Sequence, residues 1–411
     1  MREIDLLIRD LQYNSPKISA LAKQVSAGSA NLIDLFWQDV QRCGAPLIEE
    51  IEGDNENVII TFLYKGDTNI KNILIYGAFP GFRYAENIMD RLLDTNIWYK
   101  TYIIRNNAKF KYNFSLNYEF DNDYKKIKAK SILDPFNPNE IVFAKDDEAP
   151  DSTEMINSLV VMPKSKKDIW TSYRSKIHRG QIELHRLPNL DLDSNRRIWV
   201  YTPFGYKKGS DKFNLLVLTD GFDYLNYLSA KNVLDNLMYE KTIAPTVCVL
   251  IDNSINRFEE LTCNADFSNF IAQKLVPWIW DNYWVSKEAN KTIIGGVSLG
   301  GLSSAYLAFK NPDIFGNVLS QSASFWWNSE WLTNEFKKSN KLPLKFYLNV
   351  GIFEDKPYDD EPVMKDAIDN MYKVLLEKGY EVKYENFYSG HDYLSWGETL
   401  ANGLIELIGK I

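Results

Sequence analysis

The sequence has few cysteines and no long apolar run. Of its 411 residues only Cys43, Cys248 and Cys263 are cysteines, and their wide spacing fits neither a disulfide framework nor a zinc-finger motif. No stretch approaches the roughly 18 apolar residues of a membrane span. The segment Met1–Lys17 contains acidic residues and lacks the apolar core of a secretion signal. These absences predict a cytoplasmic protein without a membrane segment.

An excess of positive charge is also missing. The chain has 47 Lys and Arg against 55 Asp and Glu, a net charge of −8. Nucleic-acid binding needs a basic field, so the balance argues against a general nucleic-acid binder. Aromatic residues, by contrast, reach 14%, which favours large cores and an aromatic-lined site. The length allows two or three domains.

The first part of the chain changes from helical to strand-like patterns. Residues 3–12 and 29–42 predict short amphipathic helices. Between residues 57 and 120, β-rich runs alternate with turn residues and predict a small β-sandwich. Its last run places five apolar residues on one face: Phe110, Tyr112, Phe114, Leu116 and Tyr118. Residues 132–155, rich in Pro, Asn and acidic residues, predict an irregular connector.

After a boundary near residue 160 the pattern becomes α/β. Two domains are therefore expected, 1–160 and 161–411. Residues 180–187 and 196–203 predict an antiparallel strand pair. Buried strands are expected over 214–221, 246–252, 291–296, 317–322, 344–351 and 381–390, with helices at 229–240, 266–279, 299–310, 361–378 and 397–409. This alternation predicts a mostly parallel sheet covered on both faces.

The segment 292–306, TIIGGVSLGGLSSAY, places one serine at a sharp corner. A strand, the run Gly296-Val297-Ser298-Leu299-Gly300 and a helix form the nucleophile-elbow pattern of α/β-hydrolases. The serine backbone is strained there, and side chains two positions away would collide with the neighbouring strand and helix, so glycines are needed. Alone, the pattern is equally compatible with a glycine-rich turn that has no chemistry.

The order of the remaining candidates favours catalysis, because α/β-hydrolases run serine, acid, histidine along the chain. Only three histidines are present, and His178 and His185 precede the predicted core sheet and are interpreted as surface residues. His391 follows the last strand, where this fold needs its base. The acid should follow the preceding strand, where both Glu354 and Asp355 occur. One of them should bond His391 Nδ1 and stabilise the imidazolium.

Two backbone N–H groups are candidates for an oxyanion hole. Leu299 begins the helix after the serine, and its N–H would point to a carbonyl oxygen that becomes negative. A second donor is expected after the early strand that ends at Asp220-Gly221, from Phe222 or Asp223. The alternative for this second stretch is an ordinary Asp-Gly turn.

Several separate stretches from about residue 133 onward form a more specific combination: DPFNP, RRIWVYTP, LLVLTDG, RFEELTCNADF, GGVSLGGLSSAYLAFKNPDIFGNVLSQSASFWW, VGIFED and GHDYLSW. Together they resemble the enterochelin (enterobactin) esterases, which hydrolyse the trilactone of iron-loaded catecholate siderophores. The resemblance implies an α/β-hydrolase fold for this region. It implies an early-set, immunoglobulin-like β-sandwich for the N-terminal part, where the match is weak.

The resemblance also implies residue roles. It makes Ser298 the nucleophile and His391 the base, and its Gly-Ile-x-Glu pattern favours Glu354 over Asp355 as the acid. Arg257 falls where the family has basic or polar substrate contacts, and an arginine can pair with an anionic catecholate. The alternative is a surface ion pair with a nearby glutamate, Glu259 or Glu260.

An aromatic pair, Trp326 and Trp327, resembles one that could flank planar substrate rings, with core packing as the alternative. Ser389 departs from the family, which usually has a second glycine there. Gly397 and Glu398 depart too, since arginine often follows the tryptophan of the histidine loop. An acidic residue at that place disfavours a highly anionic iron–catecholate complex.

Three hypotheses follow. The first is hydrolysis of a ferric enterobactin-like trilactone through an acyl-serine. The second is hydrolysis of another depsipeptide, macrolactone or feruloyl-type ester. The third is a binding protein or acyltransferase on the same scaffold, and the intact serine, acid and histidine argue against a scaffold without activity. The chemistry needs no metal and no organic cofactor, and the expected partner is a small ester or lactone, with or without bound iron.

Overall fold

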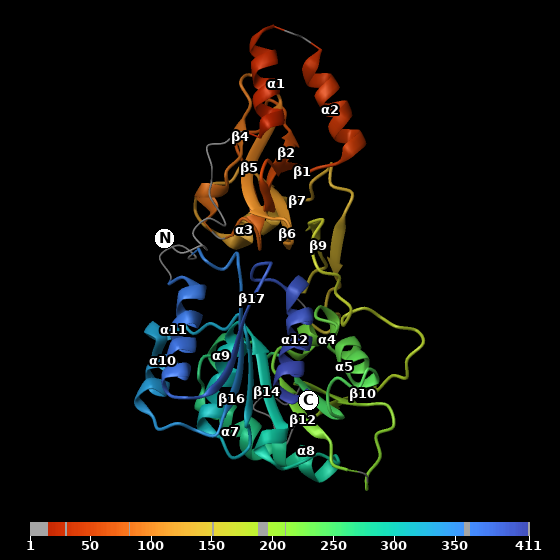
Figure 1. The fold of residues 1–411 in the computed structure, drawn as a ribbon, viewed down its shortest axis with the longest axis vertical. Helices are drawn as coiled ribbons and strands as arrows, with labels where there is room; N and C mark the ends of the chain where they lie inside the picture. The colour runs from red at the N-terminus through yellow and green to blue at the C-terminus, as the bar shows by residue number, and fades with distance from the viewer. Residues whose placement is uncertain are drawn as a thin grey trace. The chain divides into compact units, whose positions relative to one another are not determined.

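Figure 1 shows the computed structural model of the chain, which describes residues 15–28, 31–81, 83–149, 152–187, 196–209, 211–356 and 362–409. The helix predicted over residues 3–12 lies outside these residues. Contacts divide the chain into two units. Unit 1 is Met1–Lys166 with Tyr388–Gly390, and unit 2 is Lys167–Phe387 with His391–Ile411.

From residue 15 onward, where the description of unit 1 starts, the first helices are α1 (Pro16–Ser26) and α2 (Leu32–Cys43). The Ser15 side chain caps α1 by accepting a hydrogen bond from the Ile18 N–H at 3.1 Å, and proline at the first helical position suits this start. Helix α2 confirms the prediction for residues 29–42 and ends at Gly44, whose φ of 86° favours glycine.

The described residues of unit 1 also form two antiparallel sheets. The first has the order β1-β2-β5-β4: β1 (Leu47–Ile51), β2 (Asp54–Lys65), β5 (Ile97–Arg105) and β4 (Asp90–Arg91). The second has the order β3-β6-β9-β8, with β7 beside β6: β3 (Ile73–Gly77), β6 (Lys109–Leu116), β9 (Met155–Val161), β8 (Glu140–Phe143) and β7 (Ser131–Ile132). Phe62 of β2 lies 4.7 Å from the Tyr112 ring of β6, measured between centroids, so aromatic side chains of both sheets share one core.

Strand β8 corrects the prediction of an irregular connector over 132–155. Its four residues pair with β9 in antiparallel register, Val142 opposite Ile156. Such a short run between Asn-Pro-Asn and a charged cluster gives little periodicity to detect. Short helical segments lie elsewhere in unit 1, at η2 (Tyr84–Asn87) and α3 (Tyr124–Ala129).

Among the described residues, unit 2 has one eight-stranded sheet in the order β10-β11-β13-β12-β14-β15-β16-β17. The strands are β10 (Gln181–Arg186), β11 (Arg197–Thr202), β13 (Thr246–Ile251), β12 (Asn214–Leu218), β14 (Thr292–Val297), β15 (Asn317–Gln321), β16 (Lys345–Gly351) and β17 (Glu381–Phe387). The first two pair antiparallel, and the sheet is parallel from β13 to β17. The predicted strand pair and the mostly parallel sheet are both confirmed.

Helices connect these strands: α4 (Gly221–Asn226), α5 (Ala230–Tyr239), α6 (Arg257–Leu261), α7 (Ala265–Phe270), α8 (Val276–Asn282), η4 (Ala289–Lys291), α9 (Leu299–Lys310), α10 (Trp327–Lys338), α11 (Met364–Glu377) and α12 (Tyr393–Ile408). The helix predicted over 266–279 is α7 and α8 joined by a π-helical turn, η3 (Ile271–Leu275). Helix α10 was not predicted. Its first turn contains three residues with positive φ, Asn328, Ser329 and Glu330, which interrupts the helical pattern.

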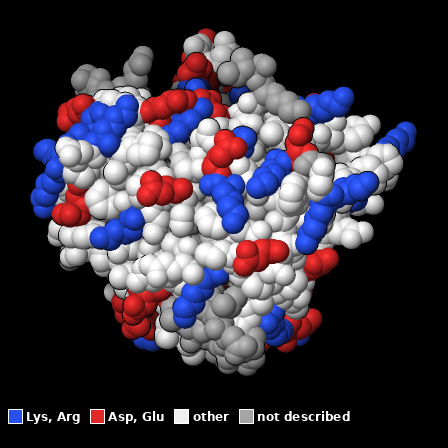
Figure 2. All heavy atoms as spheres, turned by 90° about the horizontal axis from the view of Figure 1, so that it is seen from below, with Lys and Arg blue, Asp and Glu red and all other residues white. Residues whose placement is uncertain are grey.

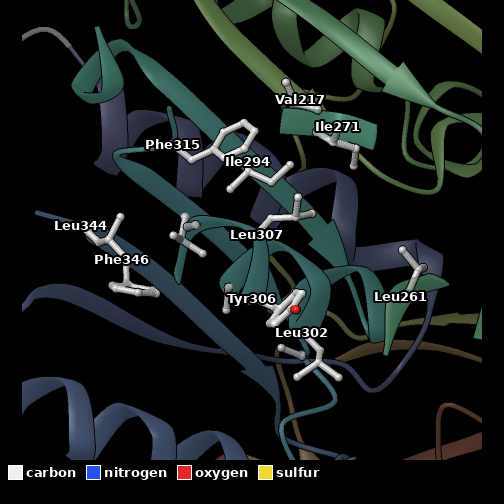
Figure 3. Packing of buried hydrophobic residues seen from close by; sticks show 14 of the residues in the cluster. Val217, Leu261, Ile271, Ile294, Leu302, Tyr306, Leu307, Phe315, Leu344 and Phe346 are labelled. Carbon is white, nitrogen blue, oxygen red and sulfur yellow. The ribbon is translucent and has the colours of Figure 1, made fainter. Parts of the chain in front are cut away.

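The core of unit 2 lies on both faces of the sheet because side chains alternate along each strand. Ile294 of β14 belongs to the cluster beneath α9, and its neighbour Ile293 belongs to the cluster that includes α5 and α12. Figure 3 shows Ile294, Leu302 and Leu307 in the first cluster. Because both faces of the sheet are buried, the sequences of these strands are continuous apolar runs.

No helix in the described part of the chain is long and apolar enough to cross a membrane. Figure 2 shows basic and acidic side chains interspersed over the face seen from below.

Candidate active site

Ser298 occupies the corner between β14 and α9. Its backbone has φ 56° and ψ −120°, a strained combination for a residue with a side chain. A Cβ added at Gly296 would lie 2.6 Å from Thr219 Oγ1, and one at Gly300 would lie 2.6 Å from Asp220 Oδ2. Both distances are shorter than real Cβ contacts. Glycine at these two positions therefore allows the segment that follows β12 to pack against the corner.

Three side chains from different elements meet at this corner. His391 Nε2 lies 3.1 Å from Ser298 Oγ, and His391 Nδ1 lies 2.5 Å from Glu354 Oε1. The Ser324 hydroxyl is also near, 3.4 Å from Ser298 Oγ. The Glu354 side chain is only 1% exposed, so its carboxylate meets the imidazole in a site sheltered from water.

The second oxygen of the Glu354 carboxylate has donors of its own. Oε2 accepts hydrogen bonds from Ser322 Oγ at 2.9 Å and from the Gly351 N–H at 2.5 Å. Asp355, the other candidate acid, has a buried Oδ1 with no hydrogen-bond partner among the described residues. Burial raises the pKa of the Asp355 carboxyl, only partly offset by the positive charge of Lys356. The geometry thus brings Glu354, and not Asp355, to His391.

The two predicted oxyanion donors begin neighbouring helices. Leu299 is the first residue of α9, and Phe222 is the second residue of α4, which follows β12. Strands β12 and β14 are adjacent and parallel, with Leu218 opposite Gly295, so both helices start at the same edge of the sheet. Asp220, between β12 and α4, is fully buried and left-handed with φ 56°.

Arg257 pairs with an acid that sequence reasoning did not consider. Its Nε donates to Asp220 Oδ1 at 2.5 Å, while its side chain remains 33% exposed. The predicted alternative, an ion pair with Glu259 or Glu260, is wrong for Glu260, whose carboxylate binds the Arg196 guanidinium at 2.6 and 2.9 Å. Arg257 is therefore anchored directly beside the segment that carries Phe222.

Asp223 adds a second acid beside Asp220. Its Oδ2 accepts a hydrogen bond from the Tyr393 hydroxyl at 3.0 Å. Burial, reinforced by the nearby charge of Asp220, raises the pKa of the Asp223 carboxyl to about 7. The charge on this side of the site therefore changes near neutral pH through Asp223.

The tryptophan pair lies at the start of α10. Both Trp326 and Trp327 are half-buried and pack against the core cluster beneath α9. The remaining histidines have other partners. His178 is exposed and stacks on Phe204 at 4.2 Å, and His185 Nε2 lies 2.7 Å from the Tyr283 hydroxyl.

The departure at Gly397 has a steric cause, since a Cβ there would lie 2.5 Å from the Leu228 carbonyl oxygen. Helix α12 therefore packs too closely against Leu228 to admit an arginine at this position. Within the described ranges, no group of three or more His, Cys, Asp or Glu side chains could hold a metal ion.

Comparisons with known proteins match this chain to one family model and to several relatives. The model of a family described as "Putative esterase" matches residues 191–407. The iron(III) enterobactin esterase of Escherichia coli K12 is 33% identical over 53% of this chain and 54% of its own length. This chain thus matches about half the length of that relative. The iron(III) salmochelin esterase of Escherichia coli O6:H1 is 24% identical over 96% of this chain and 98% of its own.

Among solved structures, an enterobactin esterase from Shigella flexneri, crystallised in the presence of enterobactin, has a TM-score of 0.68. It is 25% identical, and the match covers 89% of this chain and 96% of that one. Unit 2 accordingly has an α/β-hydrolase-like fold, with Ser298 at the corner between a strand and a helix.

Proposed function

Because this chain belongs to the putative esterase family, as an enterochelin esterase-like member, we propose that it is a serine esterase that opens the ester bonds of an enterobactin-like siderophore trilactone. The observation that carries the proposal is the continuous contact from Ser298 Oγ through His391 to Glu354, with steps of 3.1 and 2.5 Å. A hydrogen-bonded serine, histidine and carboxylate in this order activate the serine hydroxyl, which is a weak nucleophile at its own pKa.

The reaction has two halves. His391 Nε2 accepts the Ser298 proton while Oγ attacks the ester carbonyl carbon, and Glu354 holds the Nδ1–H and stabilises the imidazolium. The N–H groups of Leu299 and Phe222 bind the tetrahedral oxyanion. The carbon–oxygen bond to the alcohol then breaks, and the alcohol leaves with the proton from His391. Water repeats the sequence on the acyl-serine and frees the acid.

Two groups are proposed to contact the substrate. Arg257 would face an anionic group with the guanidinium nitrogens that Asp220 does not use, because only its Nε is bound there. Trp326 would offer a ring face to a planar group. We also propose that unit 1 is an early-set, immunoglobulin-like β-sandwich, which its two antiparallel sheets support.

A second substrate class is favoured by one specific observation. Glu398 adds negative charge after Trp396, and tight packing at position 397 excludes the arginine that often follows this tryptophan in the family. Another depsipeptide, macrolactone or feruloyl-type ester is therefore the second candidate, and an acyltransferase would use the same acyl-serine.

One substrate panel tests these alternatives. Purified protein is incubated with iron-loaded enterobactin, iron-free enterobactin, methyl ferulate and p-nitrophenyl butyrate, and the products are identified by mass. Linear trimer, dimer and monomer from enterobactin are expected, and a Ser298→Ala variant should fold normally and lose at least about 10³-fold in kcat. Turnover retained in pure Ser298→Ala protein, or wild-type protein that cleaves none of the four esters, would refute the proposal.

A further inference from the structure

We infer that Ser322 is a positioning residue, and that its hydroxyl, held by the indole of Trp396, fixes how the Glu354 carboxylate meets His391. The inference rests on the proposed esterase function. The Ser322 hydroxyl is buried beside Glu354 and takes no part in the proposed reaction steps.

The hydroxyl lies where two parallel strands end side by side. Ser322 directly follows β15, and Glu354 comes three residues after the end of β16, which pairs with β15 in register. The Ser322 backbone N–H donates to Asn349 Oδ1 at 3.0 Å and to the Asn349 carbonyl at 3.1 Å. These contacts fix the backbone of Ser322, so its Oγ stays 2.9 Å from Glu354 Oε2.

Donor chemistry gives the chain of hydrogen bonds one direction. An indole N–H can only donate, so Ser322 Oγ must accept from Trp396 Nε1, 3.0 Å away. The one hydroxyl proton of Ser322 then points to Glu354 Oε2, which also accepts from the Gly351 N–H. With two donors on Oε2, the remaining carboxylate oxygen, Oε1, is left to accept from His391 Nδ1–H.

This arrangement selects the histidine tautomer that the reaction requires. When Nδ1 carries the proton, Nε2 presents its lone pair to Ser298 Oγ and can take the serine proton. The Trp396 N–H also polarises the Ser322 hydroxyl, which strengthens the hydrogen bond from that hydroxyl to Glu354.

Trp396 is itself held at both ends. Gln321, the residue before Ser322, donates from Nε2 to the Trp396 carbonyl at 2.8 Å and accepts from the Tyr224 hydroxyl at 2.7 Å. The Trp396 ring meets the His391 ring edge to face, 4.8 Å between centroids. The indole therefore contacts the base directly and reaches the acid through Ser322.

The backbone supplies an independent observation. Ser322 is fully buried with φ 45°, a left-handed conformation that is strained for a residue other than glycine. Glycine would adopt this conformation without that strain. A serine that occupies it is consistent with a requirement for the hydroxyl.

Two substitutions separate a positioning role from a general loss of stability. Ser322→Ala and Ser322→Gly both remove the hydroxyl, but glycine also relieves the backbone strain. With p-nitrophenyl butyrate, and active sites titrated by a fluorophosphonate, both should lower kcat per titrated site about 10- to 100-fold, the effect of one hydrogen bond to a charged group. KM should stay within about twofold, since the hydroxyl does not contact substrate.

The control is Ser320→Ala. Ser320 is buried in β15, two residues before Ser322, but its hydroxyl bonds the Gly301 carbonyl at 2.8 Å, so kcat should change less than about threefold. Trp396→Phe retains an aromatic ring beside His391 but removes the N–H, and should cost about 3- to 10-fold in kcat. The double variant Ser322→Ala/Trp396→Phe should be no worse than Ser322→Ala alone, because the indole N–H acts through the Ser322 hydroxyl.

Several results would overturn the inference. An unimpaired Ser322→Gly variant, an equal loss in Ser320→Ala, or additive losses in the double variant would each do so while the esterase function stands. Wild-type protein that neither cleaves the aryl ester nor reacts with the fluorophosphonate would remove the proposed function, and this inference with it.

Discussion

Replacing Glu354 by glutamine should leave the site nearly intact in shape while reversing the hydrogen bonds of the base. Two donors, Ser322 Oγ–H and the Gly351 N–H, already point at the Oε2 position. The glutamine carbonyl oxygen must occupy that position, because an NH₂ group there would face both donors. The amide NH₂ is then directed at His391 Nδ1, which has to accept.

The consequence for catalysis follows from the tautomer. If Nδ1 accepts, the imidazole proton lies on Nε2, which faces Ser298 Oγ and can no longer take the serine proton. We expect kcat to fall by about 10⁴-fold, the loss known for a wrong tautomer in such a triad, or about 5 kcal/mol of transition-state stabilisation. Glu354→Ala should lose less, because no amide then enforces the wrong tautomer.

The assay is steady-state hydrolysis of p-nitrophenyl butyrate, with circular dichroism and thermal unfolding to verify the fold. Asp355→Asn is the matched control, since it changes the adjacent carboxyl to an amide. Its activity should remain within a few-fold of wild type, because Asp355 Oδ1 has no partner among the described residues. Near-normal kcat in Glu354→Gln, or a 10³-fold loss in Asp355→Asn, would refute the assignment of the acid.

Two further predictions concern the same edge of the sheet. In Gly300→Ala the new methyl would lie 2.6 Å from Asp220 Oδ2. Thermal or urea unfolding should therefore show a free energy of unfolding lower by about 1–3 kcal/mol, and kcat should fall. A variant as stable as wild type would contradict the steric explanation for glycine at this position. In the folded protein the pKa of the Asp223 carboxyl is raised from 3.8 to about 7, so the folded protein binds this proton more tightly than the unfolded chain does. The stabilisation that follows is complete below pH 4 and is lost as the pH rises through 7. Asp223→Asn should therefore match wild type near pH 4 and exceed it by on the order of 3 kcal/mol at pH 8 in urea unfolding, whereas a difference that does not vary with pH would disprove the cause given for the shift.

Local patterns were sufficient to predict much of unit 2. The continuous apolar strands and the helices between them predicted a parallel sheet, and the glycines around Ser298 predicted a tight corner whose neighbours the structure identifies. Boundaries were less accurate. Helix α12 begins at Tyr393 instead of 397, although Asp392, which caps it by accepting the Leu394 N–H at 2.8 Å, was a visible start signal.

Contacts between distant parts of the chain could not be predicted in the same way. Ser322 meets a carboxylate 32 residues away and an indole 74 residues away, and no periodicity reports such pairs. Arg257 had two acidic neighbours in sequence, yet it pairs with Asp220, 37 residues earlier. Which strand ends lie side by side is a property of the sheet order, and the sequence contains that order only implicitly.

That sheet order has a consequence for when the protein can first act. Four adjacent strands, β14, β15, β16 and β17, are each followed by one residue of this hydrogen-bonded group. In the same order, these residues are Ser298, Ser322, Glu354 and His391. A chain emerging from the ribosome exposes its serine 93 residues before the imidazole is made. On the proposed mechanism, Ser298 lacks its base until β17 and the segment that carries His391 have been made.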